Sequence, residues 1–283
     1  MAIWFITGCS TGFGHETALA ALARGDKVIA TARNTDDIND LADKGALVIA
    51  LDLSWPEEKI QEAVNVAMEP FGSVDILFNN AGVNMVGSLE EVSSKEARAM
   101  FDVNFWGHIS VTHAILPHMR AQKHGTIAFN GSMLGWTGMG CVSTYTATKW
   151  AIAGLAHCLK EEVKGFGITV TVIEPGFFRT QAFGAAKQLF PAQGMEGYKV
   201  AMEPLRTLVG TVHGRQAGDP VKAARVIVEA LTGEGAFEGK EVPARLVLGA
   251  DAVGMVEGVL NGQKRSLEEW KSVSVSTDFT VAE

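Results

Sequence analysis

Cysteine is scarce in this sequence, and its spacing excludes two kinds of site. The three cysteines, Cys9, Cys141 and Cys158, are too few and too far apart for a disulfide framework or a C-x-x-C metal site. The seven histidines include no H-E-x-x-H spacing, so that zinc-protease signature is missing too. We therefore expect a protein of a reducing compartment that binds no metal ion.

Long basic and long apolar runs are also missing. The net charge is -8 and Lys and Arg form no block, which argues against nucleic acid or an anionic membrane as the main partner, because clustered positive charge holds both. No apolar run approaches the ~20 residues that span a bilayer, and residues 2–7 have the pattern of a strand rather than of a basic leader. We expect a cytoplasmic protein whose partner is a small molecule.

The arrangement of apolar residues predicts the fold class. They make up 47% of the chain, enough for one sizeable core, and short β-branched runs alternate with helical stretches that end in glycine. The expected strands are 2–7, 27–31, 46–51, 74–78, 125–130, 168–174 and 245–248. The expected helices are 8–24, 56–71, 93–120, 143–164 and 219–231, with a last one from about residue 252. This alternation predicts an α/β fold in one domain over 1–283, a Rossmann-type doubly wound parallel sheet of about seven strands with helices on both faces.

A glycine-rich turn separates the first expected strand from the first expected helix. It reads Thr7-Gly8-Cys9-Ser10-Thr11-Gly12-Phe13-Gly14. Gly8 would permit a tight turn, Gly12 a close backbone approach to a pyrophosphate, and Gly14 close packing of helix on strand. The N–H groups of the helix start would attract the phosphates. An ordinary glycine-rich turn is the alternative, whereas the missing Lys-Ser or Lys-Thr excludes a triphosphate P-loop.

The same residues also spell G-x-S-x-G, from Gly8 to Gly12, which could be the nucleophile elbow of an α/β-hydrolase with Ser10 as nucleophile. Such an elbow belongs deep in the sheet, with an oxyanion loop upstream of it. Only seven residues precede Gly8, so the hydrolase is the weaker alternative.

Tyr145 and Lys149 are four residues apart in the helix expected from Ser143, so their side chains share one face. A phenol with a pKa near 10 transfers protons poorly at neutral pH, and a nearby ammonium stabilises the phenolate and lowers that pKa. On spacing alone, a Tyr and a Lys four residues apart more often lie on a solvent-exposed helix face than in an active site. Tyr145, however, is one of only two tyrosines, and Ser132 directly follows an expected strand at the edge where open α/β folds bind ligands.

Three further motifs accompany these residues: Asn79-Asn80-Ala81-Gly82, Asn104 within Val103-Asn104-Phe105-Trp106-Gly107, and Pro175-Gly176. Together with the glycine turn they make the chain, from residue 2 to about residue 250, resemble the short-chain dehydrogenase/reductase family in its shorter-chain branch. The resemblance implies an oxidoreductase in which Tyr145 is the general acid or base and Ser132 hydrogen-bonds the substrate oxygen. It also implies that Lys149 binds the nicotinamide ribose and lowers the tyrosine pKa, and that Asn104 supports a water-linked proton path.

The resemblance assigns the cofactor contacts as well. They are Gly8, Ser10, Thr11, Gly12, Phe13, Gly14, Asp52, Asn80, Ala81, Gly82, Tyr145, Lys149, Pro175, Gly176, Phe178 and Thr180. Simpler roles stay open, since Asp52 could begin a turn, Asn79 could tie strands together and Thr180 could be a loop hydroxyl.

The end of the second expected strand bears on the choice of cofactor. Ala32 stands where an NAD enzyme would carry an acidic residue, and Arg33 follows it. A guanidinium can grip a phosphate bidentately, and Thr11 could add a hydroxyl. The sequence therefore predicts that NADP(H) is preferred over NAD(H).

The segment from Phe177 to about Gly218 is rich in apolar residues and predicts a lid over the substrate. Its apolar side chains are Phe177, Phe178, Phe183, Leu189, Phe190, Met195, Tyr198 and Met202, and Met133, Leu134, Trp136 and Met139 would add a second wall. Ligand sites are largely apolar with a few placed polar groups, so we expect a bulky, weakly polar carbonyl compound or alcohol. Packing on the core or a subunit contact is the alternative.

Within the family, Gly-Cys-Ser-Thr-Gly and the strand from Val28 to Arg33 are most similar to the 17β-hydroxysteroid and retinol dehydrogenase-like group, and microbial carbonyl reductases share them. Members commonly form homodimers or homotetramers, which we expect here, with residues 250–283 as a C-terminal extension. A non-catalytic dinucleotide sensor is a further alternative, although it would not need Ser132, Tyr145, Lys149 and Asn104 together.

Overall fold

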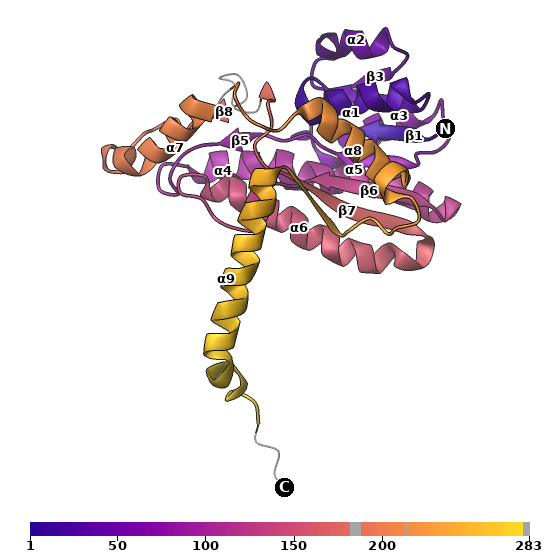
Figure 1. Ribbon diagram of the computed structural model, residues 1–283. Coiled ribbons are helices and arrows are strands. Elements are labelled where there is room, and N and C mark those ends of the chain that lie inside the picture. The colour runs from indigo at the N-terminus through magenta and orange to yellow at the C-terminus, as the bar shows by residue number, and fades with distance from the viewer. Residues whose placement is uncertain (182–187, 213, 280–283) are drawn as a thin grey trace.

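A seven-stranded parallel sheet forms the centre of the molecule (Figure 1). The computed structural model describes residues 1–181, 188–212 and 214–279. The strand order is β3-β2-β1-β4-β6-β7-β9, and all neighbouring strands are parallel. The strands are β1 (Ile3–Ile6), β2 (Lys27–Ala32), β3 (Leu47–Ala50), β4 (Ile76–Asn79), β6 (Gly125–Asn130), β7 (Ile168–Pro175) and β9 (Arg245–Leu248). The predicted Rossmann-type fold is confirmed.

Helices cover both faces of this sheet. Successive residues of a strand point to opposite faces, so each buried strand contributes side chains to two cores. Phe5 of β1 belongs to the core shared with α3, α5 and α6, whereas Trp4 and Ile6 belong to the core shared with α1 and α8. The helices are α1 (Gly12–Ala23), α2 (Asn39–Ala42), α3 (Glu57–Met68), α4 (Ser94–Phe101), α5 (Gly107–Gln122), α6 (Ser143–Val163), α7 (Lys199–Val212), α8 (Pro220–Thr232) and α9 (Ala250–Val275).

The strand order reverses at β1, since β2 and β3 lie on one side of it and β4, β6, β7 and β9 on the other. In open α/β sheets, ligands bind in the crevice outside the carboxyl ends of the strands at such a point. β1 ends at Ile6, before the glycine turn, and β4 ends at Asn79, before Asn80. The topology thus brings two of the predicted motifs to one edge of the sheet.

The helix expected over 93–120 is continuous, but its middle is wound differently. Between α4 and α5, residues Asp102–Trp106 form a π-helical turn that contains Asn104. Single π-helical turns inside α-helices occur frequently at functional sites. The π-helical turn changes the register of the helix at Asn104, a residue that the sequence motifs had indicated.

A second, two-stranded sheet was not expected from the sequence. In it, β5 (Asn84–Met85) pairs in parallel with β8 (Gln188–Leu189). A 3-10 turn, Glu196–Tyr198, leads into α7, and both lie in the segment expected to form the lid. Phe183, one of the expected lid residues, lies outside the described residues.

The last helix, α9, begins close to the expected residue and extends away from the sheet (Figure 1). Ala252 and Val256 in its first turns are buried, and Leu267 and Trp270 farther along are exposed. Within the described ranges, no helix combines the length and the apolar character needed to cross a bilayer.

Candidate active site

The glycine turn is in direct contact with the chain that follows β4. Gly8 has a φ of +70°, a conformation that favours glycine, and a Cβ there would lie 2.8 Å from the Cα of Ala81. A Cβ on Gly14 would collide with the side-chain amide of Asn80 and would lie 2.6 Å from the backbone oxygen of Gly8. Any larger residue would therefore separate the two segments.

The N-terminus of α1 is suited to an anion. Thr11 occupies the N-cap position without a capping hydrogen bond from its side chain, and the first turn contains no acidic residue. The first N–H groups of a helix lack intrahelical partners and carry partial positive charge. The turn and this helix start fit the phosphates of a dinucleotide.

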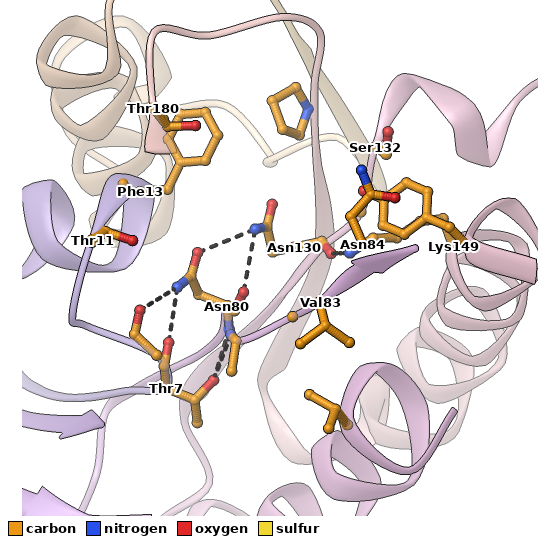
Figure 2. A pocket seen from close by; sticks show the side chains of 18 of the residues that line it. Thr7, Thr11, Phe13, Asn80, Val83, Asn84, Asn130, Ser132, Lys149 and Thr180 are labelled. Atoms are coloured by element: carbon orange, nitrogen blue, oxygen red, sulfur yellow. Dashed lines mark hydrogen bonds between the residues drawn. The ribbon is translucent and has the colours of Figure 1, made fainter. Parts of the chain in front are cut away.

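Asn80 connects the ends of three neighbouring strands (Figure 2). Its Nδ2 donates to the backbone oxygens of Thr7 at 2.9 Å and Gly8 at 3.1 Å, and Nδ2 of Asn130 donates to its Oδ1 at 3.1 Å. The Thr7 hydroxyl accepts from the backbone nitrogens of Asn80 and Ala81 at 2.9 and 3.0 Å. Thr7 and Asn130 were missed in the sequence, although each stands at the carboxyl end of a predicted strand.

Asn104 is fully buried and holds the backbone of Val83 from both sides. Its Oδ1 accepts from the nitrogen of Val83 at 2.8 Å, and its Nδ2 donates to the oxygen of Val83 at 2.9 Å. The same Nδ2 donates to Oγ1 of Thr148 at 3.2 Å, one residue before Lys149. Asn104 therefore connects the segment after β4 to α6.

Ser132 and Tyr145 meet beyond the carboxyl end of β6. Oγ of Ser132 accepts from the backbone nitrogen of Leu134 at 3.1 Å and so caps the 3-10 turn that follows. Burial raises the pKa of Tyr145 to about 12, and its hydrogen bond with Ser132 opposes that rise. The phenol is therefore the stable form at neutral pH.

Lys149 is buried beneath this pair. Its Nζ donates to the backbone oxygen of Asn130 at 2.7 Å and lies 5.5 Å from the centroid of the Tyr145 ring. Burial lowers the pKa of Lys149 to about 8. Here the ammonium is directed at the Asn130 carbonyl, and desolvation is the main cause of the raised pKa of Tyr145, so the expected lowering of the tyrosine pKa by Lys149 stays a prediction.

A buried histidine supports the same region and was not singled out in the sequence. Nε2 of His108 forms a hydrogen bond of 2.8 Å with the backbone oxygen of Ala81. Burial and then the charge of Lys149 lower the pKa of His108 to about 3, so the ring is neutral near pH 7. His108 thus holds the segment after β4 without adding charge to the site.

The glycine turn and most of the predicted site residues line one cavity of about 460 Å³. The glycine turn, Arg33 and Asp52 lie along one part of it, and Ser132, Tyr145 and Lys149 along another. All the predicted cofactor and catalytic residues except Gly14 and Asn104 are among the lining residues. The part beyond Tyr145, called the apolar end below, is walled by Val86, Met133, Leu134, Met139, Val142, Phe177, Leu189 and Leu205.

The residues expected in the lid do not all face this cavity. Phe177, Phe178 and Leu189 line it, and Phe178 is buried. Phe190 and Met195 are exposed. The segment thus covers the site with part of its apolar surface only.

Trp136 is not part of the wall predicted for it. Its Nε1 donates to Oε2 of Glu174 at 2.7 Å, and the Arg245 guanidinium lies 3.7 Å from its ring centroid. The indole is held by this polar pair and does not line the cavity.

Asp52 and Ser10 have more limited roles in the geometry. Oδ1 of Asp52 accepts from the nitrogen and the hydroxyl of Ser54 at 2.9 and 2.8 Å, so the turn role left open in the sequence is present although Asp52 also lines the cavity. Ser10 lines the cavity beside Thr11 and Gly12 of the glycine turn.

Known proteins resemble this chain over nearly all its length. Residues 2–188 match the short chain dehydrogenase family. The oxidoreductase BOA17 of Botryotinia fuckeliana is 34% identical over 97% of this chain and 98% of its own length. A short-chain dehydrogenase from Streptomyces avermitilis, known from its crystal structure, has a TM-score of 0.88 at 38% identity, with 98% of both chains covered. One from Burkholderia phymatum, solved with NAD, shares the fold with a TM-score of 0.76 at 22% identity, covering 100% of this chain and 98% of its own.

Proposed function

The chain belongs to the short-chain dehydrogenase/reductase family, and from this premise we propose that it interconverts a carbonyl and an alcohol by hydride transfer with NADP(H). Membership makes it an oxidoreductase. The observation that carries the finer proposal is the shared cavity, in which the glycine turn and the Ser132, Tyr145 and Lys149 side chains face one space. One dinucleotide and one substrate can therefore contact both sets of groups.

In this proposal, backbone N–H groups contribute more to binding of the cofactor than charged side chains do. The glycine turn and the N-terminus of α1 take the phosphates, and Asn80, Ala81, Gly82 and Lys149 take the ribose next to the nicotinamide. The bound nicotinamide supplies or accepts the hydride. Pro175, Gly176, Phe178 and Thr180 complete the wall beside it.

Tyr145 moves the proton. In reduction, its hydroxyl donates the phenolic proton to the carbonyl oxygen as that oxygen gains negative charge, and Ser132 donates a hydrogen bond to the same oxygen. The pKa of about 12 keeps the phenol protonated at neutral pH, which suits the donor role. The ammonium of Lys149 stabilises the phenolate that forms, and in oxidation that phenolate takes the proton from the alcohol.

The proposed preference for NADP(H) rests on Ala32 and Arg33. Both line the cavity at the end of β2, and no acidic side chain stands at residue 32 to repel a 2′-phosphate. Arg33 is exposed and Thr11 lines the same cavity, so both can reach an added phosphate group. The Burkholderia protein was solved with NAD, and an archaeal alcohol dehydrogenase of the same fold was solved with 5-hydroxy-NADP, so the fold itself does not decide the preference.

The apolar end supports a bulky, weakly polar substrate, because its walls carry few charges or hydroxyls. The other expectations stay predictions. They are a single domain over 1–283, a cytoplasmic location, assembly as a homodimer or homotetramer, and a small molecule rather than nucleic acid or membrane as partner.

The test is a spectrophotometric screen of NADPH and NADH consumption against ketones, aldehydes, quinones, sugars and charged keto acids. We expect the highest kcat/KM with NADPH and aryl or steroid-like ketones. Tyr145→Phe should bind NADPH normally and lose about 10²–10⁴-fold in kcat, the contribution of a positioned acid. Tyr198→Phe changes the other tyrosine and is the matched control, which should keep most turnover. Wild-type rates in Tyr145→Phe would contradict the proposal, and NADPH binding without turnover of any carbonyl would favour a sensor.

A further inference from the structure

The apolar end contains a polar side chain that the proposed reaction does not use. Ser132 and Tyr145 act on the reacting oxygen, and Asn84 is a further polar side chain among the described residues that line the cavity. Figure 2 shows the Asn84 side chain in the pocket, reaching toward Ser132. Asn84 belongs to β5, which contacts α6, the helix that carries Tyr145.

Among the described residues, no hydrogen-bond partner explains the amide oxygen of Asn84 as a structural group. Its Oδ1 is buried without a hydrogen bond to any described residue. An amide left unpaired in apolar surroundings is unfavourable, and most buried polar side chains are therefore hydrogen-bonded. Asn80 and Asn104 both use the two ends of their amides, and Asn130, whose Oδ1 is also buried without a partner among the described residues, is held through its Nδ2 by Asn80.

The backbone around Asn84 is fixed from several sides. Asn104 holds Val83 by both its nitrogen and its oxygen. On the other side, the nitrogen of Val86 donates to the oxygen of Leu189 at 2.9 Å, which continues the pairing of β5 with β8. A group held this firmly is pre-organised, so a ligand that binds it loses little free energy in ordering it.

We propose that Asn84 determines substrate specificity by hydrogen-bonding a second oxygen of the substrate, close to the carbonyl or hydroxyl that reacts. This inference rests on the proposed function and narrows its substrate class. The substrate is an apolar carbonyl compound or alcohol that carries one more carbonyl or hydroxyl oxygen near the reacting group. Nδ2 of Asn84 donates to that oxygen, and a hydroxyl can donate to Oδ1 in return.

The physical basis of this selectivity is the cost of an unpaired group. A site built around a hydrogen-bonding group discriminates against an analogue that lacks the matching group, because binding that analogue leaves the polar group buried and unpaired. The apolar walls supply affinity for both kinds of molecule. Asn84 then decides between them.

The experiment compares ethyl benzoylacetate with hexanophenone, which has a similar length but lacks the ester oxygens. Dissociation constants are measured by calorimetry with NADP⁺ present, a condition under which neither ketone can be reduced. The kcat/KM of NADPH-dependent reduction is measured separately. Asn84→Leu removes the amide at similar size, Asn84→Ser keeps a short hydroxyl if the leucine variant does not fold, and Leu205→Met alters the apolar wall without changing polarity.

Wild type should bind and reduce the keto ester better than the ketone. Asn84→Leu should weaken binding of the keto ester by about tenfold, the scale of one hydrogen bond, and leave hexanophenone unchanged or tighter. Leu205→Met should shift both compounds by the same factor, and the KM for NADPH should not move in any variant. Equal loss for both compounds in Asn84→Leu, or no preference for the keto ester in wild type, overturns the role of Asn84. Failure of the proposed function is a different result, namely binding without reduction of either compound.

Discussion

The Glu174 carboxylate and the Arg245 guanidinium form a buried ion pair that joins β7 to β9. Nε of Arg245 donates to Oε1 and Oε2 of Glu174 at 3.0 and 2.9 Å, and Nη2 contacts Oε1. The Glu174 side chain is 0% exposed. Nη2 of Arg245 also donates to the backbone oxygen of Gly135 at 3.0 Å, so the pair supports the turn that begins after Ser132.

Removing the cation of this pair should destabilise the protein strongly. Arg245→Met leaves a buried carboxylate unpaired, and we expect the free energy of unfolding to fall by ~3–5 kcal/mol. Burial raises the pKa of Glu174 and Arg245 opposes the rise, so the pKa should rise further in the variant. The folded variant then binds this proton more tightly than the unfolded chain, and its stability should fall as pH increases above the ordinary glutamate range. Denaturant unfolding at several pH values measures both effects.

The double variant Glu174→Leu, Arg245→Met separates loss of the cation from loss of packing. It removes both charges, so it should recover much of the lost stability and the added pH dependence. If Arg245→Met were as stable as wild type at every pH, water would have to reach the Glu174 carboxylate.

The sequence predicted the features that depend on residues close together along the chain, namely the strands, the helix faces and the glycine turn. Each strand has its own β-branched run, and Tyr145 and Lys149 share a helix face because they are four residues apart. The glycine turn could be placed because it directly follows a strand. These features come from local periodicity and turn chemistry, so one sequence is enough to find them.

Contacts between segments far apart in the chain leave no local periodicity or turn motif that would predict them. Glu174 and Arg245 are 71 residues apart, and nothing in either segment indicates the other. Trp136 was therefore predicted to face the substrate, although this ion pair holds it elsewhere. The pairing of β5 with β8 was missed for the same reason, since each strand has only two residues.

The two shifted pKa values near the proposed proton path predict a pH profile. The kcat/KM of reduction reports groups of the free enzyme. Tyr145, with a pKa of about 12, should stay protonated through mildly alkaline pH, whereas Lys149, with a pKa of about 8, should lose its charge there. We expect kcat/KM to fall as pH rises through about 8. Lys149→Arg keeps a cation that does not deprotonate, so it should lower the rate but abolish this decline.

If kcat/KM falls with rising pH in Lys149→Arg as it does in wild type, the group that titrates is not Lys149. The kcat/KM for NADPH is measured from rates at several NADPH concentrations and a fixed carbonyl concentration. Circular dichroism at each pH checks that the decline is not unfolding.

Arg33 should determine the cofactor preference. Arg33→Ala should lower kcat/KM for NADPH by about 10–100-fold, the scale of a charged hydrogen bond, and leave kcat/KM for NADH nearly unchanged. Arg225, exposed on α8, provides the matched control, and Arg225→Ala should change neither value. Equal efficiencies of wild type with the two cofactors, or an unchanged NADPH preference in Arg33→Ala, would show that Arg33 is a solvated surface charge.

Two carboxylates fasten the segment that contributes Leu189 to the apolar end. Oε1 of Glu91 accepts from the backbone nitrogen of Met195 at 2.9 Å, and Oε1 of Glu96 accepts from the backbone nitrogen of Ala192 at 2.8 Å. The bond from Met195 is the main cause that lowers the pKa of Glu91. The ionised form of Glu91 is therefore the one that holds the segment.

Glu91→Ala should release Met195 while Ala192 stays in place. We expect the backbone amide of Met195 to exchange its hydrogen several-fold faster, with no change at Ala192, because a separate carboxylate holds each amide. Glu62→Ala, a change at an exposed glutamate on α3, should leave both rates as in wild type. Since the pKa of Glu91 is lowered in the folded state, the wild-type protection of Met195 should be present at neutral pH and lost as pH falls below the ordinary glutamate range. Equal acceleration at both amides in Glu91→Ala would mean that the segment opens as one unit and that Glu91 does not act on Met195 alone.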